Sequence, residues 1–310
     1  LILIISIGVF ISDKFIFNHH LFLTLLLSIT TCTMVLTWGI PKLKELKLQQ
    51  IIKKEGPKEH QNKTGTPTMG GIFIIPIALF IGNLTAIKSV DSAQLLALTF
   101  LTLSFMFIGV IDDWRSLTQK TNTGLNAKAK IKLQTIASLI FLLWSGSQGW
   151  INPNIQLFSE VSINTSLFIW PLALFTLLAE SNSTNLADGL DGLASGCGAL
   201  VFSGISIQLI LRSSENNIGL ASFSIAMAGA WLGFLIHNRK PAKIFMGDTG
   251  SLPMGATLCG VALLSNSLWA LFVMGGIFLI ESLSVIIQVW IFKITKKLSG
   301  EGFRVFKMAP

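Results

Sequence analysis

Long apolar runs without a charged residue dominate the pattern along the chain. The last run continues to Phe292 with Glu281 as its only charged residue, and the triplet Ser265-Asn266-Ser267 is a natural turn inside it. A membrane-spanning helix needs about 20 mostly apolar residues. The pattern therefore predicts nine spans, which lie near 21–41, 68–87, 95–111, 132–148, 163–179, 192–211, 218–236, 250–265 and 268–292.

Residues 1–12 form a further apolar segment, which ends at Asp13 and Lys14. It is short for a span, so a partial span, an interfacial helix and the remnant of a longer helix all stay open. The composition is 51% hydrophobic and only 12% charged, whereas a soluble domain carries about 25% charged residues. We therefore predict an all-α, polytopic integral membrane protein with nine to ten transmembrane helices, folded as a single domain over residues 1–310.

Positive charge is concentrated on one face of the predicted bundle. The net charge is +8, and 20 of the 23 Lys and Arg residues fall in loops or ends that the alternating spans place on that face. The positive-inside rule makes this face cytoplasmic, so topology explains the charge better than nucleic-acid binding does. Cys32, Cys197 and Cys259 lie in apolar runs with no disulfide or metal spacing, which predicts packing roles.

Acidic residues indicate a site on the same face. Five of the seven Asp residues lie at the cytoplasmic ends of spans, in three separate loops. Because carboxylates are costly near hydrocarbon and are usually functional there, we predict that they share one site. The adjacent Asp112 and Asp113 suit Mg²⁺, which binds one or two carboxylates together with substrate phosphates. Taken alone, this pair is equally well explained as a solvated interfacial pair.

The segment 182–194 adds a second polar group to this face. Asn182 and Asn185, and then Asp188 and Asp191, are three residues apart, and two glycines lie beside them. Residues at this spacing share a face of a helix. A capped helix start would need only one such side chain, so the segment favours a polar ligand site.

Two glycine-rich segments precede predicted spans, at 63–71 (KTGTPTMGG) and 245–252 (FMGDTGSL). Backbone N–H groups and hydroxyls at a helix start suit a phosphate. The alternatives are an N-capping Asp248 in one and Pro67 in the first helical turn of the other. The four histidines show no zinc-type spacing, and no nucleophile motif is present.

Taken together, the motifs resemble the polyprenyl-phosphate sugar-1-phosphate transferases, which form glycosyltransferase family 4. The resemblance covers about residues 21 to 310, and the motifs GTPTMGG and MAP favour the muramoyl-pentapeptide branch of the family. The matching stretches are Gly56-Pro57 with His60 and Lys63, GTPTMGG (65–71), IDD (111–113), GLNAKAK (124–130), NLADGLDGLA (185–194), PAKIFMGDTGSL (241–252), ESLSVIIQV (281–289) and FKMAP (306–310).

This resemblance implies a Mg²⁺-dependent transferase in the bacterial inner membrane, with its active site on the cytoplasmic face. The implied reaction transfers phospho-MurNAc-pentapeptide from UDP-MurNAc-pentapeptide to undecaprenyl phosphate, which gives lipid I and UMP for peptidoglycan and cell wall synthesis. Both substrates are anionic, so the basic loops would attract them. A homodimer is an open alternative for the assembly.

The family's functional residues carry over by motif. The resemblance implies catalytic roles for three acids: Asp248 as the Mg²⁺ ligand, Asp113 as a support of the metal and phosphate site, and Asp112 as the base that deprotonates the lipid phosphate. A nucleophilic Asp112 in a two-step reaction is the alternative. The implied substrate contacts are Lys63, Thr68, Lys128 or Lys130, Asn182, Asn185, Asp188, Asp191 (near the uracil), Asn238 and Phe245 (stacked on the uracil).

The chain departs from the family pattern in two places. Ser116 stands where many members have Lys, and the neighbouring Arg115 is an alternative source of charge. The family continues after MAP with a triple-histidine loop and a final span, so we expect that this chain stops before them. Two other functions stay open: transfer from UDP-GlcNAc or another sugar nucleotide, and cation-coupled transport, for which intramembrane acids are typical.

Overall fold

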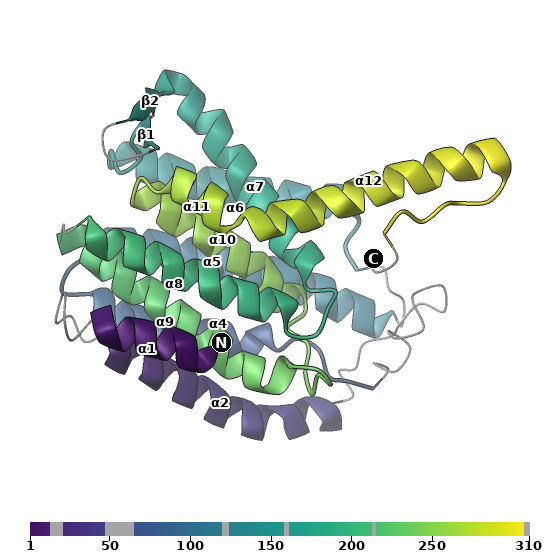
Figure 1. Cartoon of the computed structure of the whole chain (residues 1–310), viewed down its shortest axis with the longest axis horizontal. Helices are drawn as coiled ribbons and strands as arrows, with labels where there is room; N and C mark the ends of the chain where they lie inside the picture. Colours follow the sequence, from purple (N-terminus) through teal and green to yellow (C-terminus); the bar gives the residue numbers. More distant parts are fainter. Residues whose placement is uncertain (13–20, 47–64, 120–123, 158–160, 213–214, 307–310) are drawn as a thin grey trace.

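The computed structural model describes residues 1–310 except 13–20, 47–64, 120–123, 158–160, 213–214 and 307–310. The described residues form a helical bundle with one short β-hairpin (Figure 1). The elements are α1 (Ile2–Ser12), α2 (Leu21–Glu45), α4 (Gly71–Ala86), α5 (Ser92–Thr118), α6 (Ala127–Ser147), β1 (Asn154–Gln156), β2 (Ser162–Asn164), η2 (Ser166–Phe168), α7 (Ile169–Ala187), α8 (Leu193–Leu211), α9 (Glu215–Asn238), α10 (Asp248–Leu264), α11 (Leu268–Met274) and α12 (Gly276–Ser299).

The all-α membrane architecture is confirmed. Every predicted span overlaps at least one helix, and five helices of the described residues (α2, α5, α8, α9 and α12) are long and apolar enough to cross a membrane. The exact number of spans stays a prediction. The helix α1 lies along α2, with Phe10 in edge-to-face contact with Phe22 at 5.1 Å between ring centroids.

The helix α10 forms the centre of the bundle. Each of its residues from Thr249 to Leu264 is buried, as expected for a helix that is covered on all sides. The helices α4, α5 and α7 pack against it, while α9 packs against α2, α4 and α8. The helix α5 approaches α10 closely at Gly109, where an added Cβ would lie 2.2 Å from the carbonyl oxygen of Asp248. This contact holds the first residue of α10 against the last turns of α5.

Two predicted spans need correction. The span predicted at 163–179 begins later, at Ile169, because Ser162–Asn164 pairs with Asn154–Gln156 as an antiparallel hairpin. The span predicted at 268–292 is broken at Gly275 into α11 and α12. Two consecutive glycines, Gly275 and Gly276, have low helix propensity and explain the position of the break. The helix α12 then extends away from the bundle (Figure 1).

Candidate active site

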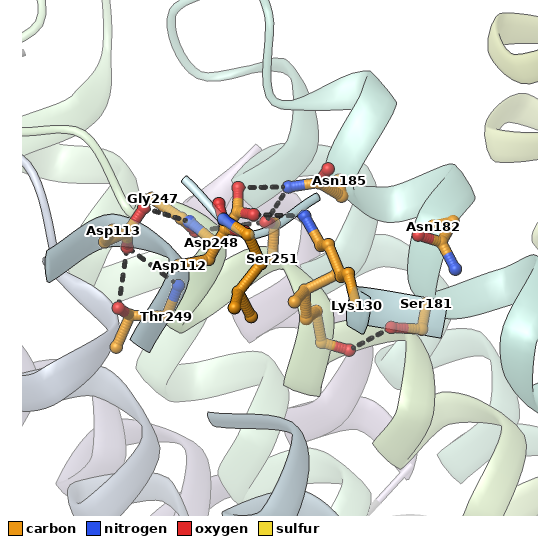
Figure 2. A network of polar contacts seen from close by, with 12 residues as sticks. Asp112, Asp113, Lys130, Ser181, Asn182, Asn185, Gly247, Asp248, Thr249 and Ser251 are labelled. Atoms are coloured by element: carbon orange, nitrogen blue, oxygen red, sulfur yellow. Dashed lines mark hydrogen bonds and ion pairs between the residues drawn. The ribbon is translucent and has the colours of Figure 1, made fainter. Parts of the chain in front are cut away.

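Four helix ends meet at one end of the bundle and bring polar side chains together (Figure 2). The C-terminal parts of α5 and α7 contribute Asp112 and Asn185, and the N-terminal parts of α6 and α10 contribute Lys130 and Asp248. Each comes from a different one of the predicted motifs. The structure therefore gathers residues that are more than 130 positions apart into one polar site.

Asp248 is the centre of this site. Its Oδ2 atom forms an ion pair with the ammonium group of Lys130, and its Oδ1 atom accepts a hydrogen bond of 2.6 Å from Nδ2 of Asn185. The same Nδ2 atom donates to Oγ of Ser251 at 2.9 Å. The Lys130 and Asp248 side chains are only 16% and 20% exposed, so solvent screens their attraction less than at an open surface.

The Asp112 carboxylate lies near enough to that of Asp248 for their negative charges to repel, and it accepts a hydrogen bond of 2.9 Å from the backbone N–H of Leu125. Two carboxylates this close repel each other unless a cation lies near them or one of them holds a proton. In the structure the ammonium group of Lys130 supplies the positive charge.

Lys130 lies two residues before the predicted span at 132–148. Burial disfavours its charged form, but the attraction of Asp248, Asp112 and Asp113 is stronger in sum, so the pKa of Lys130 is raised above its ordinary value. We infer that Lys130 keeps its charge in this site at neutral pH. Of the two lysines between which the sequence left the choice open, the structure brings Lys130 into the site, whereas Lys128 is exposed.

Asp113 points to the start of α10 rather than to Lys130. Its Oδ1 atom accepts a hydrogen bond of 3.2 Å from the backbone N–H of Asp248, and its Oδ2 atom accepts bonds from N and Oγ1 of Thr249 at 3.0 and 2.7 Å. Gly247 makes this approach possible: its φ is +67°, and a Cβ added there would lie 2.4 Å from Oδ2 of Asp113.

The two glycine-rich segments pair with each other beside the acids. The N–H of Phe245 donates to the carbonyl of Pro67 at 2.8 Å, and the N–H groups of Gly70 and Gly71 donate to the carbonyls of Phe245 and Met246 at 2.9 and 3.1 Å. Among the predicted substrate contacts, Thr68 and Phe245 lie in this pairing and are 6% and 8% exposed. Lys63 lies outside the described residues.

Asn238 and Asp191 hold the loop between α7 and α8 against the loop before α10. Asn238 is 1% exposed; its Oδ1 atom accepts from the N–H of Gly192 at 3.0 Å, and its Nδ2 atom donates to the carbonyl of Ile244 at 2.9 Å. Oδ2 of Asp191 accepts from the N–H of Ala242 at 3.1 Å. Both residues therefore shape the loops in this structure, and their contact with substrate stays a prediction, as does that of the half-buried Asp188.

Asn182 lies one helical turn from Asn185 and away from the acids (Figure 2). Its Nδ2 atom donates to Oε1 of Gln134 at 2.9 Å, and Gln134 is fully buried between α6 and α7. Sequence reasoning missed Gln134, together with Thr249 and Ser251. An amide side chain near the start of the predicted span 132–148 was the signal for the first, and the two hydroxyls that follow Asp248 were the signal for the others.

A comparison with protein families identifies the class of protein to which this chain belongs. Residues 95–266 match the sequence model of the Glycosyl transferase family 4, and the polar site lies almost wholly inside this stretch. The chain is a multi-pass membrane protein and a transferase of that family.

Comparison with individual relatives makes the assignment narrower. The chain is 60% identical to the phospho-N-acetylmuramoyl-pentapeptide-transferase of Prochlorococcus marinus (strain MIT 9313) over 97% of this chain and 81% of the relative. It is 54% identical to the transferase of the same name from Synechococcus sp. (strain CC9311), over 100% and 84%, and 57% identical to that of Synechococcus sp. (strain CC9605), over 100% and 89%. The chain therefore belongs to the phospho-N-acetylmuramoyl-pentapeptide-transferase family.

Proposed function

We propose that this chain transfers phospho-MurNAc-pentapeptide from UDP-MurNAc-pentapeptide to undecaprenyl phosphate, giving lipid I and UMP at the cytoplasmic face of the inner membrane. The observation that carries this proposal is the meeting of Asp112, Lys130 and Asp248 at one end of an apolar bundle. A soluble nucleotide and a lipid phosphate meet only at a membrane surface, so charged reacting groups belong at the end of a bundle. The names of the relatives support the choice of substrates.

We propose Mg²⁺ as the cofactor, with Asp248 as its ligand and Asp112 beside it. The described part of the chain contains no group of three or more His, Cys, Asp or Glu side chains that would enclose a metal ion. Mg²⁺ commonly takes one or two carboxylates and completes its shell with water and substrate phosphates, so the pair of Asp112 and Asp248 fits this ion. When bound, Mg²⁺ would neutralise the diphosphate and favour the departure of UMP.

The side chains of the site then have distinct tasks. Asp112 takes the proton from the lipid phosphate, whose oxygen forms a bond to the sugar-bearing phosphorus of the nucleotide. The bond from this phosphorus to the bridging oxygen breaks, and UMP leaves with that oxygen. Lys130 neutralises charge on the diphosphate, and Asn185 holds the carboxylate of Asp248 in place. Lys63, Thr68, Asp188, Asp191 and Phe245 remain proposed contacts of the nucleotide.

The test is Mg²⁺-dependent release of UMP by the whole chain in detergent, from UDP-MurNAc-pentapeptide with undecaprenyl phosphate. We expect release with this pair and none with UDP-GlcNAc, with EDTA, or in Asp248→Asn. Omitting the lipid separates the two mechanisms, because only an enzyme that forms a covalent intermediate on Asp112 releases UMP without acceptor. Release of UMP from UDP-GlcNAc but not from UDP-MurNAc-pentapeptide would contradict the proposal. Release by Asp248→Asn at the rate of the unaltered chain would contradict it as well.

A further inference from the structure

Both oxygens of the Asp113 carboxylate accept hydrogen bonds from the first residues of α10. It accepts three hydrogen bonds, which come from the N–H of Asp248 and from N and Oγ1 of Thr249. The first N–H groups of a helix have no partner inside the helix and need an acceptor from elsewhere. The residue before α10 is Gly247, which has no side chain to cap it. Asp113, which belongs to α5, therefore caps the N-terminus of α10.

This cap is made with the backbone at the start of α10 and with Thr249, not with the groups that contact the Asp248 side chain. Figure 2 shows Asp113 directed at the backbone of Asp248 and Thr249, while the Asp248 side chain reaches toward Lys130 and Asn185. Thr249 is fully buried, so its hydroxyl cannot contact a substrate. The three hydrogen bonds fix the backbone from which the Asp248 carboxylate projects.

We propose that Asp113 is a positioning residue, which caps α10 through Thr249 and thereby aims the carboxylate of Asp248, and that it is not itself a ligand of the divalent cation. This inference rests on the proposed function only in taking Asp248 to hold that cation. Groups that orient a metal ligand commonly change metal affinity by about 10- to 100-fold when they are removed. The Thr249 hydroxyl touches neither Asp248 nor the cation in this scheme, yet its loss should weaken cation binding.

The experiment measures the binding of Mn²⁺ by electron paramagnetic resonance on the purified whole chain, with and without UDP, together with the thermal midpoint. We expect Thr249→Val to weaken Mn²⁺ binding by about 10-fold, Thr249→Ser to bind as tightly as the unaltered chain, and Asp113→Asn to resemble Thr249→Val. The matched control is Thr257→Val in the same helix. Thr257 is also buried and its hydroxyl contacts that of Thr102 at 2.8 Å, but it lies more than two turns from Asp248.

We expect Thr257→Val to lower the thermal midpoint and to leave Mn²⁺ binding unchanged. Weakened Mn²⁺ binding in Asp113→Asn but not in Thr249→Val would make Asp113 a direct ligand and overturn the proposal. A lower midpoint in Thr249→Val with unchanged Mn²⁺ binding would overturn it too, because the cap would then serve stability alone. Failure of the unaltered chain to bind Mn²⁺ would overturn both this inference and the cation of the proposed function. Failure of transfer with intact Mn²⁺ binding would count against the proposed function only.

Discussion

The Nδ2 atom of Asn185 donates a hydrogen bond of 2.6 Å to Oδ1 of Asp248 and another of 2.9 Å to Oγ of Ser251. Since an amide NH₂ group has two hydrogens, Asn185 serves both acceptors at once. The Oγ atom of Ser251 in turn donates to the carbonyl of Gly247 at 3.0 Å. These hydrogen bonds connect the last turn of α7 to the side chain of Asp248 and, through Ser251, to the backbone carbonyl of Gly247.

Replacement of Asn185 by Ala removes both donors and leaves an oxygen of Asp248 without its partner. A hydrogen bond to a charged group contributes about 1.5–3 kcal/mol, so we expect kcat/KM for UMP release to fall by about 10-fold or more. Asn83→Ala is the control, because Asn83 also bonds across helices, to Thr99 at 3.0 Å, but lies in α4 away from the acids. Equal activity of Asn185→Ala and Asn83→Ala would contradict the role of Asn185.

Lys130 and a divalent cation should compete for Asp248, because the ammonium group of Lys130 already pairs with Oδ2 of that residue. In Lys130→Met the carboxylates of Asp112 and Asp248 lose this positive charge, and their repulsion favours a cation between them. We therefore expect tighter binding of Mn²⁺ in the absence of nucleotide, and slower transfer because the diphosphate loses a positive partner. Spin resonance titration and the UMP assay measure the two effects.

The control for this prediction is Lys132→Met, which removes an exposed lysine from the same helix. It should leave Mn²⁺ affinity and transfer near those of the unaltered chain, since exposed charges are screened by solvent and salt. If Lys130→Met binds Mn²⁺ more weakly than Lys132→Met does, Lys130 does not compete with the cation for Asp248 and supports cation binding instead.

The sequence predicted the helical architecture and the acids of the site for a simple physical reason. Charged residues are rare in this chain, so Asp112 and Asp248 at the ends of apolar runs were conspicuous. The choice between Lys128 and Lys130 was not possible, because it depends on which face of α6 is turned toward α10. The tasks of Asp113 and Asn238 were hidden for a similar reason, since their hydrogen bonds go to backbone groups of other elements. The sequence shows which polar side chains are present, but it does not show which backbone N–H and C=O groups of other elements need a hydrogen-bond partner.

The break between α11 and α12 was missed because hydrophobicity continues through it. It lies next to Glu180 of α7: a Cβ added at Gly275 would be 3.3 Å from Oε1 of that residue. Length and composition indicate a span, but the glycine pair decides where the helix breaks, and the absence of a side chain at Gly275 leaves room for Glu180.

Glu180 lies at the edge of an apolar cavity of about 370 Å³, which Phe175, Trp269 and Leu279 also line. Within the described structure its Oε1 atom is buried and has no hydrogen-bond partner. A buried carboxyl group in apolar surroundings destabilises the fold, because it must either stay ionised without a partner or take up a proton on folding. The isosteric, neutral Glu180→Gln should therefore raise the thermal midpoint. Glu45→Gln, at the exposed end of α2, should leave it unchanged. A lower midpoint in Glu180→Gln would show that the carboxyl group has a favourable partner.

Gly247 is a position at which adding a single methyl group should disturb the site. Its φ of +67° and the 2.4 Å that would separate an added Cβ from Oδ2 of Asp113 both oppose a side chain there. We expect Gly247→Ala to lower the free energy of unfolding by about 1–3 kcal/mol and to weaken Mn²⁺ binding, because Asp113 must move away from the start of α10. Gly276→Ala is the control, since an added Cβ there meets no atom within 4 Å, and Ala favours a helix. Gly276→Ala should keep full Mn²⁺ binding. If Gly247→Ala had the same thermal midpoint and Mn²⁺ affinity as this control, the contact between Gly247 and Asp113 would not constrain Asp248.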